Sequence, residues 1–535
     1  MSQMLKSSGA MAAATLLSRV LGMVREMVYS RFMGTTWVAS AFLLAFQIPN
    51  LFRRLLGEGA LTAAFIPIFK EKEKLEGDAA MWRAASAVIS ALIVAVSVVV
   101  ALGFVGVSLA LAYGRHVDGD TTRFSGNTLL MLELLRVMLP YLVLVCLAAV
   151  MMGMLNARGH FFIPAMGATT LNVVMIASVF WLAPRFGHEL PAHRRLPVQI
   201  FALAIGVLAA GVAQAAFQVP SLWRDGFRYR WVTPWRDETV RRVLRQMIPG
   251  IVGVAAFQIN VVLTQGLAYC WVDDYIVASF QYAVRLMELP QGLFGISLAT
   301  YLLPTLAGLA TEKKYDDFRQ ELRQGVGYLV FTNVIASVLL LVLAEPIIRL
   351  LFEGRKFDAT STAQTTLALA CLAPGLVAFS MVNVLARAFF ALGDTKTPMK
   401  TSVFCLILNL LLAFALVWRF KQGGLGIANT ITAMLNVGLL TYALRRKLKR
   451  LEWQPLRATL LPVAGAGALA GLVAWGGWRW WECALGHWTL ALKLGAVFVP
   501  ACVAGLLYWL LTLAGKVPAA CDITHVAFSR LRRSP

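Results

Sequence analysis

Acidic side chains are scarce in this chain of 535 residues, which has 27 Asp and Glu against 49 Lys and Arg. Charged residues make up only 14% of the sequence, whereas a typical soluble domain has about 25%. Hydrophobic residues make up 59%, above the roughly 45–50% that is usual for soluble domains. This composition excludes an ordinary soluble protein and indicates a membrane protein.

The sequence also lacks the short motifs that carry common catalytic chemistry. It has no G-x-x-x-x-G-K-[ST] phosphate-binding loop, no recognisable nucleophile–base arrangement and no metal-ligand spacing among its six histidines. Its seven cysteines show no C-x-x-C spacing and lie mostly in apolar runs, so we interpret them as small buried hydrophobic residues. We therefore expect a protein that is neither an enzyme nor a nucleotide-driven pump and that needs no cofactor; the motifs identify no coupling ion.

Long apolar runs recur along the chain, among them 84–113, 202–219 and 327–344. Only helices or closed barrels can cross lipid, and these runs are too long and too continuously apolar for the strands of a barrel. The sequence therefore predicts an all-α polytopic membrane protein with about 14 transmembrane helices. The predicted spans are 8–33, 37–68, 81–113, 129–156, 161–184, 197–222, 240–270, 274–309, 321–344, 360–392, 397–419, 424–446, 456–481 and 488–514.

The net charge of +22 is distributed in short basic clusters between the apolar runs. Examples are "FKEKEK", "EKKYDDFRQELRQ", "LRRKLKRLEW" and the tail "SRLRRSP". This is the positive-inside pattern of membrane proteins, and there is no continuous basic stripe of the kind that binds nucleic acid. We expect both termini to be cytoplasmic and the first apolar run to be a membrane helix that is not cleaved as a signal peptide.

The sequence resembles itself at a spacing of about 234 residues. "LPYLVLVCLAAVMMGMLNARGHFFIP" begins at Leu139, and "APGLVAFSMVNVLARAFFALGDTKTP" begins at Ala373, with two prolines and a glycine aligned. Transporters are often built from such repeats, with the substrate site near the membrane midplane between them. The predicted organisation is an N-terminal six-helix lobe (1–222), a basic cytoplasmic linker (223–239), a second six-helix lobe (240–446), and two extra helices with a basic tail (447–535).

Charged side chains lie inside several predicted helices. In "NLFRRLLGEGALTAAFIPIF", which begins at Asn50, Arg53 and Arg54 lie near the centre of an apolar stretch that would be about 48 Å long as a helix. Arg54 and Glu58 are four residues apart and would share a helix face. The other such residues are Arg19, Arg25, Glu26 and Arg31 in the first predicted helix, and Arg285 and Glu288 in the eighth.

Two interpretations of these charges are open. Arg31 lies near a helix end and fits snorkelling, and Arg54 with Glu58 fits a structural ion pair as well as a site. For Arg19, Arg25, Arg53 and Arg285 we favour a water-filled cavity, because an arginine facing lipid costs at least about 2.5–3.5 kcal/mol. An excess of arginine in such a cavity predicts an anionic ligand, and the planar guanidinium suits phosphate oxygens.

Five motifs stand out in the sequence. They are "SRVLGMVREMV" at Ser18, "SAFLLAFQIPNLFRRLLGEGALTAAFIPIF" at Ser40, "LNARGHFFIPA" at Leu155, "RLMELPQGLFGISLAT" at Arg285 and "GDTKTPMK" at Gly393. Together these motifs resemble the lipid II flippase family MurJ, also called MviN, of the exporter superfamily that includes the multidrug MATE transporters. The motifs spread over about three quarters of the chain. Members often have Asp at the positions of Ser40 and Val284, so the acidic role in this chain would fall to Glu26, Glu58 or Glu288.

The resemblance implies export of lipid II, the undecaprenyl-pyrophosphate-linked peptidoglycan precursor, across the bacterial inner membrane by alternating access. It assigns head-group binding to Arg19, Arg25, Arg53, Arg285 and Glu288, with Arg54, Glu58 and Glu26 as secondary candidates. The two last helices would border a groove for the lipid tail. The expected partners are lipid II and membrane lipids, without nucleic acid or nucleotide. The alternatives are a flippase for another undecaprenyl-linked glycan, a cation-coupled multidrug antiporter and a membrane scaffold without transport activity.

Overall fold

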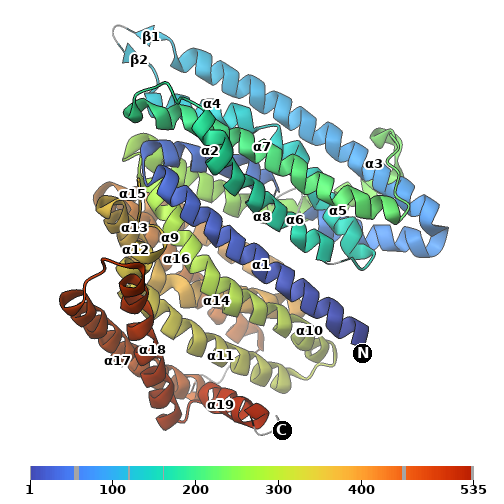
Figure 1. Cartoon of the computed structure of the whole chain (residues 1–535). Coiled ribbons are helices and arrows are strands. Elements are labelled where there is room, and N and C mark those ends of the chain that lie inside the picture. The colour runs from blue at the N-terminus through green and yellow to red at the C-terminus, as the bar shows by residue number, and fades with distance from the viewer. Residues whose placement is uncertain (1, 54–59, 119–120, 161, 449–453, 532–535) are drawn as a thin grey trace. The chain divides into compact units, whose positions relative to one another are not determined.

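The computed structural model describes residues 2–53, 60–118, 121–160, 162–448 and 454–531 (Figure 1). The described chain is almost entirely helical. It divides into two compact units, Met1–Ala278 and Ser279–Pro535, and each is described by itself below. The predicted lobe boundaries at 222, 240 and 446 remain predictions.

The described part of the first unit contains eight complete α-helices and one small hairpin. Helix α3 contacts α4, α5 and α8, and α6 lies against both α1 and α7. The hairpin pairs β1 (Val117–Asp118) with β2 (Thr121–Thr122) after α3. The helices are α1 (Ser2–Met33), α2 (Trp37–Phe52), α3 (Ala60–Gly114), α4 (Gly126–Met138), α5 (Tyr141–Ala157), α6 (Phe162–Ala177), α7 (Ala192–Arg224) and α8 (Glu238–Trp271).

The second unit contains the remaining helices, from α9, which begins just before the boundary, to α19. Helices α17 and α18 lie side by side (red in Figure 1), and α17 packs against α11. The helices are α9 (Ile276–Pro290), α10 (Ser297–Thr311), α11 (Tyr315–Val342), α12 (Ala344–Leu351), α13 (Ala359–Leu372), α14 (Leu376–Ala391), α15 (Lys396–Phe420), α16 (Gln422–Leu448), α17 (Gln454–Ala484), α18 (Leu490–Ala514) and α19 (Pro518–Leu531).

All fourteen predicted spans fall on helices where the structure describes them, but fewer helices are long and apolar enough to cross a membrane. Among the described residues, ten helices are long and apolar enough, or eleven if the bent pair α4–α5 is one span. The predicted number of fourteen is therefore not confirmed. Helix α2 has only 16 residues, and α1 carries several charged side chains. The predicted span 37–68 covers α2 and the start of α3, and residues 54–59 between them lie outside the described part of the chain.

Two interruptions shape the long helices. Gly77 has φ +83°, a conformation that favours glycine, and it separates the first turns of α3 from the apolar span that follows. In the second unit, Pro290 ends α9 and is followed by a π-helical turn, Gln291–Ile296, which leads into α10. A Cβ atom on Gly295 in this turn would lie 2.7 Å from Ser380 Oγ of α14, so the turn depends on glycine for its close contact.

The internal repeat has a structural counterpart at the ends of α5 and α14. Gly159 and Gly393 follow these helices with φ of +86° and +72°. The His160 N–H donates to Leu155 O, and the Asp394 N–H donates to Phe389 O, each at 2.9 Å. These bonds match the glycine-dependent motif that satisfies the last carbonyl groups of a helix. The aligned sequences thus form the same helix end in both units.

The cysteines do not follow one pattern of burial. Cys146 and Cys405 are buried, as expected, and Cys371 is partly buried. The prediction is wrong for the other four, which are exposed. In a membrane helix an apolar run need not mark burial, because the side that faces lipid is apolar as well. The exposed cysteines are Cys270, Cys483, Cys502 and Cys521.

Candidate anion-binding site

Arg25 is held in place by polar side chains from two helices of the first unit. Its Nη2 lies 2.5 Å from Oε1 of Glu26, and its Nη1 donates to Asn172 Oδ1 of α6 at 3.0 Å. The side chains of Arg25 and Glu26 are only 13% and 7% exposed. Asn172 Nδ2 also donates to the carbonyl of Ser18 at 3.3 Å, which ties α6 to α1. Arg25 is therefore a buried, oriented cation with an acidic partner.

Arg19 lies on the same helix in a different environment. Its side chain is exposed, and it makes no hydrogen bond or ion pair with the part of the chain that the structure describes. The structure thus separates the two arginines of the "SRVLGMVRE" segment into a free cation and a fixed one. Both are cations on one helix, and arginine suits a ligand that brings its own negative charge.

Arg53 lies directly after α2 and is half-buried. Its backbone N–H donates to the carbonyl groups of Pro49 and Asn50, so the helical path continues through Arg53. Arg54 and Glu58, the predicted secondary pair, lie outside the described residues.

Arg285 and Glu288, which the sequence places three residues apart on one helix face, form an ion pair on α9. Arg285 Nη1 lies 2.8 Å from Glu288 Oε2, and the two side chains are 35% and 43% exposed. An ion pair this exposed contributes only about 0–1 kcal/mol to folding. The stability of the fold therefore does not depend on this ion pair, and the charges of Arg285 and Glu288 are accessible to a ligand. The π-helical turn begins three residues after Glu288, and such turns often lie at functional sites.

Ser40 has a structural role that its sequence did not reveal. Its buried Oγ accepts a hydrogen bond from the N–H of Ala278 at 3.0 Å, in the first turn of α9. A hydroxyl oxygen can thus satisfy a free N–H of this helix end, as a carboxylate at the same position would. Val284, the other position where the family often has Asp, is partly buried.

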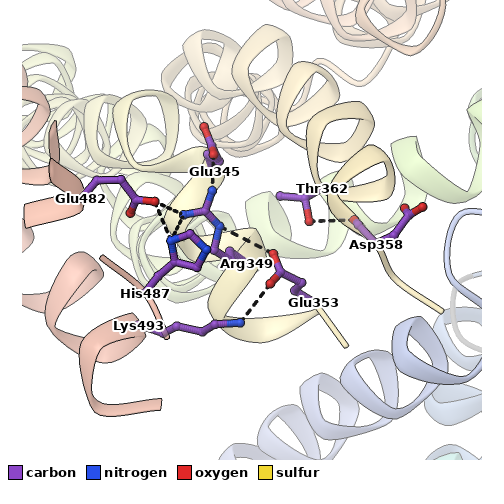
Figure 2. Close-up of polar contacts among 8 residues, drawn as sticks. All are labelled: Glu345, Arg349, Glu353, Asp358, Thr362, Glu482, His487 and Lys493. Carbon is purple, nitrogen blue, oxygen red and sulfur yellow. Dashed lines mark hydrogen bonds and ion pairs between the residues drawn. The ribbon is translucent and has the colours of Figure 1, made fainter. Parts of the chain in front are cut away.

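Sequence analysis missed Asn172, although it is a lone amide in the apolar run 161–184. It also missed a charged cluster in the second unit, centred on Arg349 (Figure 2). Arg349 Nη1 lies 2.9 Å from Glu482 Oε1 and 3.2 Å from His487 Nδ1. The signal for this cluster was the four-residue spacing of Glu345 and Arg349 on one helical face, with Glu353 a further four residues along, just after the end of α12.

The Arg349 cluster joins α12 to the end of α17 and the start of α18. Arg349 Nη2 contacts Glu345 at 2.5 Å, and Lys493 Nζ lies 3.0 Å from Glu353 Oε1. Figure 2 shows Arg349 at the centre, with carboxylates on several sides and His487 against it. Because Arg349 is only 14% exposed, its contacts are well shielded from water. The cluster anchors the end of α17 and the start of α18 to α12 of the second unit.

Known proteins place the chain in a family. The profile of the lipid II flippase MurJ family matches residues 29–494. The chain is 34% identical to a lipid II flippase MurJ of Burkholderia cenocepacia, over 86% of this chain and 88% of that protein. It is 32% identical to a probable lipid II flippase MurJ of Vibrio cholerae, over 82% of each.

Solved structures show the same fold. A lipid II flippase MurJ in an inward closed conformation matches with a TM-score of 0.74 at 20% identity, over 96% of this chain and 99% of that one. An inward-facing multidrug resistance MATE transporter of the MOP superfamily matches with a TM-score of 0.66 at 14% identity, over 83% and 99%. The chain is a multi-pass membrane protein with the fold of the MOP superfamily. Its profile match and its relatives above 30% identity show that it belongs to the lipid II flippase MurJ family.

Proposed function

We propose that this chain carries lipid II from the inner to the outer leaflet of the bacterial cytoplasmic membrane by alternating access. Family membership over most of the chain is the observation that carries this proposal. The relatives are named as lipid II flippases, and the chain covers more than four fifths of their length. A flippase needs no covalent chemistry, which agrees with a sequence that has no recognisable catalytic motif.

In this proposal, arginines bind the anionic head group. Arg25 is oriented by Glu26 and Asn172, so little side-chain entropy is lost when it meets a pyrophosphate. Arg19 and Arg53 add positive charge in the first unit, and Arg285 adds it in the second. Arg285 would exchange its exposed contact with Glu288 for the ligand at small cost, because such pairs contribute little to stability.

Both termini lie in the cytoplasm in this proposal. The basic loops that precede α11 and α17 would then be on the inner face, as the positive-inside rule requires. The Arg349 cluster would lie at the outer ends of α17 and α18. The substrate would enter from the inner leaflet with its tail in lipid.

The likeness to a MATE transporter keeps a cation-coupled multidrug antiporter as the second candidate. The fold does not separate the two, since it is shared. The charge of the chain separates them. A site for cationic drugs would have acidic or aromatic walls, whereas this chain places arginines in its first helix, four residues after Pro49 and five residues before Pro290.

The test is depletion of the protein in its native bacterium, with measurement of lipid-linked precursors in each leaflet. Accumulation of lipid II in the inner leaflet is expected. Accumulation of a different undecaprenyl-linked glycan would assign another substrate, and unchanged lipid II with increased drug sensitivity would favour the antiporter.

A further inference from the structure

A cavity of about 850 Å³ opens in the first unit, away from the arginines discussed above. One wall is the part of α3 that follows the Gly77 break, and the other is the segment 226–237 between α7 and α8. The side chains that matter for its chemistry are Trp82, Arg83, Arg228, Arg230, Trp231 and Asp237.

The cavity carries excess positive charge. Three arginines line it, and Asp237 is the one carboxylate among its lining residues. Oδ1 of Asp237 already accepts the N–H groups of Thr239 at 2.9 Å and Val240 at 3.3 Å, as the cap of α8. The carboxylate therefore serves the helix end and leaves the arginines largely uncompensated.

Two of the three arginines are available to a ligand. Arg228 is partly engaged, because its Nη1 donates to the carbonyl groups of Trp223 and Phe227, each at 2.9 Å. Arg83 and Arg230 are exposed, and neither makes a hydrogen bond or ion pair with any described residue. Free guanidinium groups on both walls make this a site for a ligand with several anionic oxygens.

The segment that forms the second wall is fixed to α3. Tyr229 Oη and Ser90 Oγ are 3.0 Å apart, and the Val232 N–H donates to the same Ser90 oxygen at 3.3 Å. Trp82 packs against Phe227 with ring centroids 5.4 Å apart. The cavity is therefore largely formed before a ligand binds, which lowers the entropic cost of binding.

The chain around the cavity carries exposed tryptophans. Trp231 lines the cavity and is 58% exposed, and Trp223 at the end of α7 and Trp235 on the segment 226–237 are also more than half exposed. Tryptophan and arginine together are typical of the level of the lipid head groups, where an indole ring meets both lipid and water. The ligand is thus expected at the membrane surface.

We propose that this cavity binds the phosphate-bearing head group of a membrane lipid, with Arg83 and Arg230 as its main contacts. The assignment of the cavity to the inner leaflet rests on the proposed function, in which the segment 226–237 is on the cytoplasmic side. Two inner-leaflet lipids share the required chemistry: an anionic phospholipid, and the polyprenyl pyrophosphate of an incoming substrate.

The experiment compares lipid binding by the purified full-length protein and its variants, using native mass spectrometry. R83Q/R230Q removes both free guanidinium groups, and the matched control R224Q/R245Q removes two exposed arginines of the same region outside the cavity. The probes are phosphatidylglycerol, undecaprenyl pyrophosphate and, as a neutral reference, phosphatidylcholine. We expect R83Q/R230Q to weaken binding of at least one anionic probe by about tenfold or more, because it loses charge-assisted hydrogen bonds.

The outcomes distinguish an anionic phospholipid from the polyprenyl pyrophosphate of the substrate. A loss for phosphatidylglycerol alone identifies a phospholipid site, a loss for undecaprenyl pyrophosphate alone identifies a substrate-capture site, and a loss for both identifies a shared site. Equal binding by R83Q/R230Q and the control for both probes would overturn the proposal, as would an equal loss for phosphatidylcholine. If the double variant does not fold, R230Q in the loop serves with R224Q as its control. Lipid binding in detergent does not depend on transport. A failure of the cavity proposal can therefore be distinguished from a failure of the flippase proposal.

Discussion

Asp394 and Lys447 form an ion pair of 2.8 Å that ties the turn after α14 to the end of α16. Asp394 also accepts the N–H of Thr397 at 3.0 Å, at the start of α15. At the corresponding place of the first unit, His160 Nε2 lies 3.1 Å from Asp225, so the acidic side chain is here at the end of α7 and not in the turn after α5. The repeat thus preserves the helix end and a polar contact beside it, with the position of the acidic residue exchanged.

The pair predicts a specific acid sensitivity. The Lys447 ammonium, followed by the Thr397 N–H, lowers the pKa of Asp394 well below its ordinary value of about 3.9. A carboxyl group whose pKa is lower in the folded state stabilises above its unfolded pKa, and this contribution is lost as pH falls toward the folded value. Thermal unfolding in detergent should show D394N less stable than wild type at pH 7, by at most about 1 kcal/mol, and the difference should shrink below about pH 4. A constant difference from pH 7 to pH 3 would contradict the assignment.

Replacement of the arginines that we propose as head-group contacts should separate function from folding. We expect Arg53→Ala and Arg285→Ala to abolish complementation of a depletion strain while membrane abundance stays near normal. The Arg285 pair is exposed, so its loss should cost no more than about 1 kcal/mol of stability. Arg53→Lys should restore function only in part, because an ammonium lacks the planar fork for two oxygens. Full complementation by both alanine variants would rule out the proposed anion contacts.

Substitution of Arg349 should destabilise the protein without touching the proposed ligand contacts. In R349M, Glu345, Glu353 and Glu482 would face one another without their central cation, at a cost of about 2–4 kcal/mol. The matched control is R355Q, an exposed arginine on the following turn. Thermal unfolding should show a large decrease for R349M and little change for R355Q. Equal melting temperatures for the two variants would remove the anchoring role of the cluster.

Three glycines of α17 should respond differently to tryptophan. A Cβ atom on Gly467 or Gly471 would lie 2.8 Å from Val334 or Val338 of α11, so a large side chain there should disrupt packing and lower membrane abundance. Gly465 has no such neighbour within 4 Å. We expect Gly465→Trp to preserve abundance and to impair flipping, if α17 borders the groove for the lipid tail. Normal flipping by Gly465→Trp would leave α17 with a packing role.

Reporter fusions test the orientation. A reporter that is active only in the cytoplasm should work after Pro535, and one that is active only outside should work near Asp118 in the β1–β2 hairpin. The opposite pattern would reverse the orientation inferred from the basic loops.

Hydropathy located the helices because lipid demands long apolar runs, and all predicted spans coincide with helical segments. The charged residues were also found from sequence, since Arg25 or Arg285 within such a run is conspicuous. Their partners were harder to predict. Asn172 meets Arg25 across 147 positions, and Glu482 meets Arg349 across 133, and nothing in local periodicity encodes such contacts. The hydrogen bond from Ala278 to Ser40 was missed for the same reason, since it joins a side chain to a distant backbone N–H.

The π-helical turn at Gln291–Ile296 holds one residue more than an α-helix of the same length would use. Absorbing that residue into regular α-helix would turn one flank against the other by about 100°, the angle between successive residues. Arg285 and Glu288 lie on one flank, and α10 is the other. The turn therefore sets the direction in which the charged face of α9 points relative to α10, and deleting one residue of the turn would redirect Arg285 and Glu288 by that angle.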